Sequence, residues 1–407
     1  MSQRKTGTAL KLLAIASGVL LAAIPGLWLY MSATATPLHP NPQDVPSVTS
    51  SAPLSQKADA VEQGRQIVRA TLAEQNLPGL SVAVGRGGEI VWAEAFGFAD
   101  LENRIPVTPK HRYRIGTAST VLTSAAAGLL MEKGRLKLDE TIQEYVPEFP
   151  QKQWPVTVRQ LMGHLAGVRT DGGDEGPLFA EHCGRPAEAL QHFSDGSLLF
   201  QPGTEYRYSS YGWILISAAI EAAAGKPFLT FMQEQVFDPL RMHDTEPDSA
   251  AEPTQDRVTF YFPRFAADPK YGLHLMRDLD YSCYAGSSVF LSTPSDLVRF
   301  GMGIESGKLL QGSTVRLLQS PQRLASGERT GYGLGWDVKT VTLAGRQTTV
   351  AGHDGESLGG MVASLRTFPE HGLVVSVTSN ISYADTFSLA VKIAQAFVEQ
   401  GSSPGGK

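Results

Sequence analysis

Alternating apolar and polar residues mark strands near both ends of the chain. Residues 80–84 and 89–93 alternate in this way, and the glycine-rich stretch 85–88 between them predicts a β-hairpin. Towards the C-terminus, four more runs are predicted to be strands: 333–339, 348–352, 361–368 and 373–380. A single antiparallel sheet would bring the two groups of strands together.

Apolar residues at helical spacing occupy the regions around these strands. Residues 60–74 and 385–398 are predicted to form one helix before the hairpin and one after the last strand. The stretch 117–237 is predicted to be mostly helical with long loops. Its first helix has an apolar face that starts at Val121, and Gly134 is typical of the position after a helix end.

The N-terminal region, residues 1–58, differs in composition from the rest. Residues 1–11 are basic, and an uncharged apolar run of about 20 residues follows at 12–31, long enough to span a bilayer. This length favours an uncleaved transmembrane anchor over a signal peptide, although Ala33 and Ala35 offer a cleavage site. Residues 32–58 are rich in Pro, Ser, Thr and Ala and are predicted to be a flexible spacer. The basic residues would stay cytoplasmic, so the rest of the chain is expected on the extracytoplasmic side of the inner membrane, the periplasm in a Gram-negative cell.

Length and charge are those of one large globular unit with appendages. The chain has 407 residues and a formal net charge of −5, and the patterned part occupies residues 59–400. Lysine and arginine form no run beyond the extreme N-terminus, so no nucleic-acid partner is expected. The Gly/Ser/Pro tail at 401–407 is predicted to be disordered.

Candidate chemistry begins at residues 113–120, which read YRIGTAST and lead into the first helix of the central region. This stretch resembles the nucleophile segment of the serine beta-lactamase and penicillin-binding-protein family, which reads Ser-x-x-Lys. In that motif the serine attacks a carbonyl, and the lysine one turn later takes or relays its proton. The matching positions hold Thr117 and Thr120, so the resemblance implies that these threonines occupy the catalytic positions without the lysine amine.

The resemblance extends over residues 61–397 and is to class C-like members, above all the mitochondrial serine beta-lactamase-like proteins and their bacterial relatives. Further similar segments are 136–140, 145–150, 161–167, 290–297 and 331–336. The resemblance implies an α+β fold of the beta-lactamase/transpeptidase type. In that fold an antiparallel sheet from both chain ends is flanked by helices and carries an inserted, mainly helical lobe. It also implies a cleft for a small-molecule or peptide ligand.

A second family motif, Tyr-x-Asn, has its counterpart at Tyr208 and Ser210, with serine in place of asparagine. The resemblance implies that Tyr208 carries a proton between nucleophile and leaving group. It also implies that Ser210 binds substrate as a shorter hydrogen-bond donor than the amide. The alternative is a tyrosine that packs in a loop and bonds to the backbone.

The third family motif, Lys-Thr-Gly or His-x-Gly at the sheet edge, is present as His353, Asp354 and Gly355. By resemblance, His353 is expected to help hold a substrate carboxylate, and Gly355 to leave room for a ligand along the strand. The charge of Asp354 is expected to disfavour an anionic substrate. Alternatively, His353 is a strand-end residue bonded to solvent.

Two hypotheses follow for activity. Where a nucleophile and a base act as a pair, loss of either one lowers turnover by a factor on the order of 10⁴–10⁶. This favours a catalytically silent member that binds a ligand or partner in the cleft. The other hypothesis is a slow hydrolase of esters, amides or peptides, acylated at Thr117 with Tyr208 as proton carrier. Thr117 also suits a helix N-cap, whereas Ser119, rotated about 200° from it, suits a first-turn helix residue.

The two cysteines, Cys183 and Cys283, lie in regions that border the cleft by family resemblance, in a compartment expected to be oxidising. A disulfide between them is one expectation and two buried free thiols are the other, because sequence does not set the Cα separation that a bridge needs. No metal site is expected, since the nine histidines include no His-Glu-x-x-His and no close His/Cys/Asp cluster. No cofactor is implied.

Overall fold

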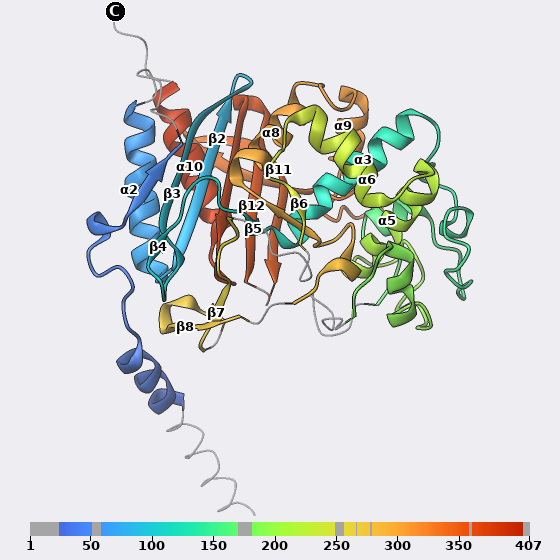
Figure 1. Ribbon diagram of the computed structural model, residues 1–407. Helices are drawn as coiled ribbons and strands as arrows, with labels where there is room; N and C mark the ends of the chain where they lie inside the picture. Colours follow the sequence, from blue (N-terminus) through green and yellow to red (C-terminus); the bar gives the residue numbers. More distant parts are fainter. Residues whose placement is uncertain are drawn as a thin grey trace, which may run out of the picture.

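The computed structural model describes residues 24–50, 58–169, 181–248, 256–265, 267–276, 279–357 and 360–401. An antiparallel sheet of eight strands forms its centre (Figure 1). The strand order is β1-β3-β2-β13-β12-β11-β10, with β4 paired to β3. The N-terminal hairpin therefore meets the C-terminal strands where β2 pairs with β13, which confirms the prediction of one sheet built from both chain ends.

The strands of the main sheet have the following bounds: β1 Ser47–Thr49, β2 Gly79–Arg86, β3 Glu89–Asp100, β4 Ile105–Pro106, β10 Asp337–Leu343, β11 Arg346–Ser357, β12 Met361–Phe368 and β13 Leu373–Ser379. Two small sheets contain β5 Tyr113–Arg114, β6 Glu246–Pro247 and β9 Phe290–Ser292, and β7 Tyr261–Pro263 with β8 Leu273–Leu275. The α-helices are α2 Ala58–Gln75, α3 Ser119–Glu132, α4 Val158–Met162, α5 Ser210–Ala224, α6 Phe228–Met232, α7 Asp238–Leu240, α8 Pro294–Glu305, α9 Gly312–Leu318 and α10 Thr386–Gly401.

The predicted hairpin is formed by β2 and β3. Gly87 and Gly88 connect them with φ angles of 62° and 84°, the left-handed conformation that suits a two-residue turn between twisted strands. The strand predicted at 333–339 is only partly confirmed, because β10 begins at Asp337. The amide of Leu334 donates to the carbonyl of Leu318 at the end of α9 instead, and the amide of Gly333 donates to the carbonyl of Trp336 within the same stretch.

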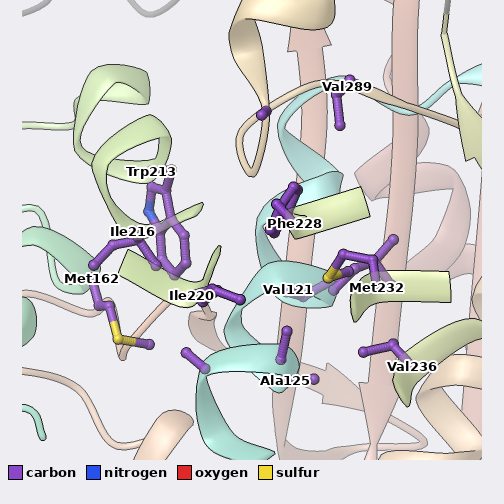
Figure 2. Close-up of a cluster of buried hydrophobic side chains, with 14 of the residues drawn as sticks. Val121, Ala125, Met162, Trp213, Ile216, Ile220, Phe228, Met232, Val236 and Val289 are labelled. Atoms are coloured by element: carbon purple, nitrogen blue, oxygen red, sulfur yellow. The ribbon is translucent and has the colours of Figure 1, made fainter. Parts of the chain in front are cut away.

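Helices cover both faces of the sheet because residues along each strand alternate between the faces. Val82 and Val84 of β2 belong to a core with α2 and α10, which pack against each other. Ala83, between them, faces the second core, which includes α8 and the helical lobe. Figure 2 shows the centre of that lobe, where side chains of α3, α5 and α6 meet: Val121, Ala125, Trp213, Ile216, Ile220, Phe228 and Met232. The predicted mainly helical lobe, which lies in sequence between the N-terminal and C-terminal strands of the sheet, is therefore confirmed.

Part of the predicted spacer packs against the domain. Strand β1 pairs with β3 at the sheet edge, and Val45 is 3% exposed. His39 stacks on Phe98, and a ring nitrogen of His39 lies 2.8 Å from the carbonyl oxygen of Leu77. The flexible-spacer prediction is therefore wrong for residues 35–50, because an open sheet edge can bind a chain segment through its backbone. Residues 51–57 lie outside the described residues.

The predicted membrane anchor is described only in part. Residues 1–23 and the tail residues 402–407 lie outside the described residues, and residues 24–34 form a helix on which Leu27 and Trp28 are exposed. In the part of the chain that the structure describes, no single helix is long and apolar enough to cross a membrane. The pair Ser210–Ala224 and Phe228–Leu240 meets that test only together, with a bend of 76°.

Candidate functional site

A cleft of about 380 Å³ lies between the start of α3, the loop before α5, and strands β10 and β11. The residues that line it are Thr117, Tyr206, Tyr208, Tyr332, Asp337, Lys339, His353 and Asp354. Three predicted site residues, Thr117, Tyr208 and His353, thus come together from distant parts of the sequence. Thr120, Ser210 and Gly355 are not among the lining residues.

Thr117 lies in a 3₁₀ turn, η3 (Gly116–Ala118), that continues into α3. Its hydroxyl Oγ1 donates a hydrogen bond to the backbone carbonyl of Asp354 on β11, at 3.0 Å. The N-cap of α3 is Ala118, without a side-chain cap, so Thr117 does not take the N-cap role considered above. Ser119 is the first residue of α3 and is buried, as expected for a first-turn helix residue. Thr117 therefore lines the cleft with its hydroxyl bonded to strand β11.

Thr120 follows Thr117 by three residues, slightly less than one helical turn, and is fully buried. Its Oγ1 has no hydrogen-bond partner within the described residues. A hydroxyl in such a place keeps its own proton, since its pKa is far above that of an amine that could act as a base. Position 120 therefore contributes no proton acceptor to the cleft.

Gly355 brings strand β11 against the start of α3. A Cβ atom at this position would collide with the backbone carbonyl of Ile115 and would lie 3.0 Å from the amide nitrogen of Ala118. The space beside Gly355 is therefore filled by the protein's own backbone. The prediction that this glycine leaves room for a ligand is replaced by a packing role, because only a residue without a side chain permits so close an approach.

His353 is buried and forms two hydrogen bonds that define its tautomer. Nδ1 lies 2.6 Å from the carbonyl oxygen of Asp354, which can only accept, so Nδ1 carries the proton. Nε2 lies 2.9 Å from the Tyr332 hydroxyl and accepts from it. Burial lowers the pKa of His353 below 6.5 and raises the pKa of Tyr332 well above 10, which keeps both groups neutral. The alternative of a strand-end histidine bonded to solvent is wrong.

Asp354 is part of an ion cluster on the outer strands. Its carboxylate accepts from the buried Arg366 on β12 and from Ser364 Oγ at 2.6 Å. Arg366 also lies 3.2 Å from Asp337, which pairs with Lys339 at 2.7 Å. Two carboxylates thus face two cations. The expectation that Asp354 repels an anionic substrate is therefore not supported, because its charge is compensated locally.

The register of the sheet explains this cluster. Gly352 of β11 is opposite Asp337 on one neighbouring strand and opposite Arg366 on the other. Because Gly352 has no side chain, the two charged groups can meet across the strand between them. Asp354 is two residues further on, on the same face, within diagonal reach of Arg366.

Tyr208 is held by the start of α5 and by His164. Ser209 caps α5, because its hydroxyl accepts from the amide of Gly212 at 3.3 Å. The amide of Ser209 in turn donates to Nδ1 of His164 at 3.1 Å. The His164 ring packs on the Tyr208 ring, with centroids 4.2 Å apart. Ser210 is the first residue of α5 and is buried, so its predicted role as a substrate donor has no support from the cleft lining.

His164 is a buried residue that the sequence did not single out. Its φ of 59° is unusual for a residue with a side chain, and burial, aided by His353, lowers its pKa well below 6.5. Nε2 has no hydrogen-bond partner within the described ranges. The side chain therefore supports the tyrosines as a neutral ring.

Four lining residues were missed by the motif comparison: Tyr206, Tyr332, Asp337 and Lys339. Tyr332 lies inside a segment that resembles the family, but nothing in the segment indicates a bond to His353. Asp337 and Lys339 alternate at the start of β10, which is a pattern that many edge strands share. Their place at the cleft follows from strand order, which is a tertiary property.

Cys183 and Cys283 are joined in a disulfide, with Cα atoms 4.8 Å apart. Neither cysteine lines the cleft that contains Thr117. Cys183 lines a second pocket of about 490 Å³, together with residues such as Glu221 and Phe228. The lining of the cleft thus gives no support to the expectation that the regions of both cysteines border it.

Comparisons with known proteins find relatives along most of the chain. Residues 65–398 match the family model described as Beta-lactamase. The human mitochondrial serine beta-lactamase-like protein LACTB is 27% identical over 442 residues, which cover 84% of this chain and 80% of that protein. Penicillin-binding protein 4* of Bacillus subtilis (strain 168) is 25% identical over 299 residues, which cover 70% of this chain and 64% of that protein.

Solved structures share the fold. The penicillin-binding protein homologue from Pyrococcus abyssi has a TM-score of 0.69 at 22% identity and covers 83% of this chain and 77% of its own. The D-amino acid amidase from Ochrobactrum anthropi SV3, solved with L-phenylalanine amide, also has a TM-score of 0.69 at 22% identity, over 84% of this chain and 98% of its own. The predicted beta-lactamase/transpeptidase-like fold is confirmed.

Proposed function

Because the chain belongs to the beta-lactamase family, we propose that it is a member whose cleft binds a small-molecule or peptide ligand and is catalytically silent. The observation that carries this proposal is the state of the two threonines. The Thr117 hydroxyl gives its proton to the backbone carbonyl of Asp354, and Thr120 offers a buried hydroxyl where the family has an amine. A nucleophile without its base loses most of its turnover.

Other groups around the cleft do not replace the missing base in this arrangement. Among the described lining residues, Lys339 is the one amine, and it is paired with Asp337. The proton on Nδ1 of His353 is bonded to the Asp354 carbonyl, and Nε2 already accepts from Tyr332. A base must have a free lone pair near the proton it removes. This supports binding over catalysis.

The lining favours a small ligand with an apolar or aromatic group and an amide or carboxylate. Three tyrosines supply apolar area with polar ends. Lys339 is 47% exposed and offers a cation to an acidic or carbonyl group, next to its partner Asp337. The amidase of similar fold, whose solved structure holds L-phenylalanine amide, suggests amino acid amides as probes.

A slow hydrolase remains the second candidate because of one contact. Thr117 Oγ1 and His353 Nδ1 bond to the same carbonyl oxygen, that of Asp354. A change of tautomer or a small shift would let the imidazole accept the threonine proton. In this reading Thr117 is acylated and Tyr208 carries the proton to the leaving group, at a rate far below that of Ser-Lys members.

One experiment separates the two candidates. The full-length protein is incubated with a tagged fluorophosphonate and with a fluorescent penicillin, and its intact mass is measured. The proposal expects unchanged mass, together with reversible binding of L-phenylalanine amide in calorimetry that a Tyr208→Ala variant weakens. A stoichiometric adduct on Thr117 would support the hydrolase instead, and no binding of any small amide or peptide would contradict the ligand-binding role.

We further propose that residues 12–31 anchor the chain in the inner membrane, with the globular domain on the extracytoplasmic side. Support comes from the length of the apolar run and from the basic residues before it. Full-length protein is expected in the carbonate-washed membrane fraction, and protease added to spheroplasts should digest the domain. Recovery of a soluble form that begins near Thr36 would show a cleaved signal instead.

A further inference from the structure

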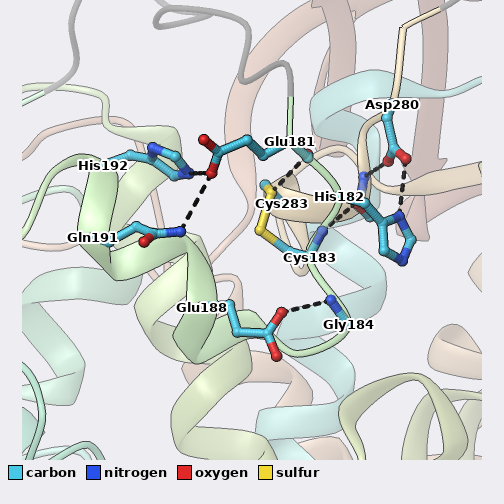
Figure 3. The surroundings of a disulfide bond; sticks show 10 residues. Glu181, His182, Cys183, Gly184, Glu188, Gln191, His192, Asp280 and Cys283 are labelled. Atoms are coloured by element: carbon cyan, nitrogen blue, oxygen red, sulfur yellow. Dashed lines mark hydrogen bonds and ion pairs between the residues drawn. A yellow bond between two sulfur atoms is a disulfide. The ribbon is translucent and has the colours of Figure 1, made fainter.

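A cluster of metal-binding side chain types lies away from the cleft, around the disulfide (Figure 3). The ligand atoms of Cys183, His192 and Cys283 all lie within 4.8 Å of one another. Both cysteines are buried, and the His192 side chain is 20% exposed. His192 ends the 3₁₀ helix η5 (Pro186–His192), and Cys283 lies in η8 (Ser282–Tyr284), so separate segments supply the three donors.

A fourth donor is next to these three. Glu181 Oε2 lies 3.5 Å from Nε2 of His192, and the same carboxylate oxygen is 3.5 Å from Gln191 Nε2. The backbone carbonyl of Glu181 lies 3.2 Å from Cys283 Sγ, so the start of this segment is in contact with the cluster. The Glu181 side chain is 65% exposed and can turn without breaking buried contacts.

Cysteine sulfur, imidazole nitrogen and carboxylate oxygen are all donor types that tetrahedral Zn²⁺ binds, and four such donors fill its coordination shell. While the cysteines are bonded to each other, neither sulfur is a thiolate, and a metal has no soft donor to bind. We propose that Cys183, Cys283 and His192, with Glu181 as fourth ligand, form a zinc site when the disulfide is reduced. The same segments are then held by a covalent bond in the oxidised chain and by the metal in the reduced chain.

The disulfide form is converted into the zinc form in two steps, reduction and metal binding. A dithiol reductant gives two electrons and two protons to the bond between Cys183 and Cys283, which breaks into two thiols, while the reductant becomes a disulfide. Zn²⁺ then binds the two sulfurs as thiolates and releases their two protons to solvent. Zinc therefore competes with reoxidation, because bound thiolates are not free to attack.

The required movement is small. A disulfide holds its sulfurs about 2 Å apart. Two thiolates on one tetrahedral zinc are about 3.8 Å apart, given a Zn–S distance of about 2.3 Å. The cysteines are separated by 100 residues in sequence, which is why the chain contains no short metal-binding motif and why no metal site was expected from it. The proximity of the donors is a property of the fold.

Cobalt is a suitable probe because Co²⁺ takes the tetrahedral site of zinc and reports thiolate bonds by colour. The full-length protein is reduced with a dithiol, desalted without oxygen and titrated with Co²⁺. One Co²⁺ per chain is expected, with a sulfur-to-cobalt charge-transfer band that one equivalent of Zn²⁺ removes. The oxidised protein, the same chain without reductant, should give no such band. Zinc should also slow alkylation of both cysteines, read by peptide mass.

Two histidine variants test the donor assignment. His192→Ala should weaken Zn²⁺ binding at least about tenfold, the smaller of the losses seen when a supporting residue of a metal site is removed. His182→Ala is the matched control, since His182 is next to Cys183 in sequence but pairs with Asp280 at 2.9 Å. It should bind zinc like the unchanged protein. No charge-transfer band in the reduced protein, or equal loss in both variants, would overturn the proposal. If His192→Ala does not fold, failure of zinc to protect the cysteines from alkylation in the unchanged chain overturns it as well.

Discussion

The cleft has two walls that differ in their titratable side chains: the η3–α3 wall, with Thr117, and the tyrosine–histidine wall, with Tyr208, Tyr332 and His353. On the η3–α3 wall, Thr117 lines the cleft, Thr120 three residues later is buried, and neither side chain contains an amine. On the tyrosine–histidine wall, Tyr332 and His353 share a hydrogen bond, and the Tyr208 ring packs on the His164 ring. If the proposed function is correct, the comparison teaches that a scaffold can keep its cleft without the amine that would act with Thr117, because packing and catalysis depend on different atoms.

The largest effect is expected from placing a serine and a lysine at positions 117 and 120 of the η3–α3 wall. Thr117→Ser combined with Thr120→Lys should raise hydrolysis of an activated ester about 10²–10⁴-fold over either single variant, the contribution typical of a positioned acid–base group. Nucleophile and base act as a pair, so each change alone should give little. Steady-state hydrolysis and acylation by fluorescent penicillin measure the effect.

The control for this restoration is Thr117→Ala combined with Thr120→Lys. It keeps the buried amine without the nucleophile and should show no gain. The Ser-Lys variant must fold, judged by its thermal transition. If it folds and is still as inactive as this control, then the tyrosine–histidine wall does not support catalysis either, and the two walls do not differ in this respect.

A second prediction concerns the contact that joins the walls. Gly355→Ala should lower the free energy of unfolding by about 1–3 kcal/mol, because the added methyl group meets the backbone of Ile115, which cannot move aside as a side chain could. Urea unfolding of both proteins measures the difference. Gly312→Ala, at the start of α9 with its nearest neighbour in the flexible tip of Arg316, is the matched control and should be nearly neutral. An equal loss in both variants would mean that Gly355 has no special packing role.

How much of this arrangement could be predicted from sequence depends on how local each feature is. The hairpin at Gly87–Gly88 and the candidate positions Thr117 and His353 follow from short patterns, since turns and motifs are written in neighbouring residues. The pairing of Asp354 with Arg366 does not, because it depends on which strands are neighbours and in what register. Composition also misled in the proline- and serine-rich segment 35–50, where Ser47–Thr49 form an edge strand.

A third prediction tests whether the neutral form of His164, which packs against the tyrosine–histidine wall, stabilises the folded protein. Burial lowers the pKa of His164 well below 6.5, so the unfolded chain takes up a proton at a higher pH than the folded one. Stability contributed by the neutral ring is therefore present above about pH 6.5 and is lost as the pH falls, by up to about 1.4 kcal/mol per pH unit. His164→Asn, which tolerates the positive φ, should flatten the dependence of unfolding free energy on pH between about 6.5 and 5.

The exposed His243 provides the comparison for that experiment, as His243→Asn. Urea unfolding at several pH values gives the slope for each protein. If His164→Asn and His243→Asn have the same slope as the unchanged protein, then His164 does not contribute to acid sensitivity, and the neutral-ring account of this wall fails.

The smallest effect is expected at the start of α5, the helix that follows Tyr208. Ser209 accepts from the amide of Gly212 and so caps α5, while its own amide bonds to His164. Ser209→Ala should cost about 1 kcal/mol in unfolding free energy, and Ser209→Gly only a few tenths, the usual difference at an N-cap. Because the amide remains in both variants, His164 should keep its partner, and the affinity for L-phenylalanine amide should change less than with Tyr208→Ala. A loss of affinity as large as that of Tyr208→Ala would mean that the Ser209 cap itself positions Tyr208. The position of the lining residues on both walls would then depend on the start of a helix, α3 on one wall and α5 on the other.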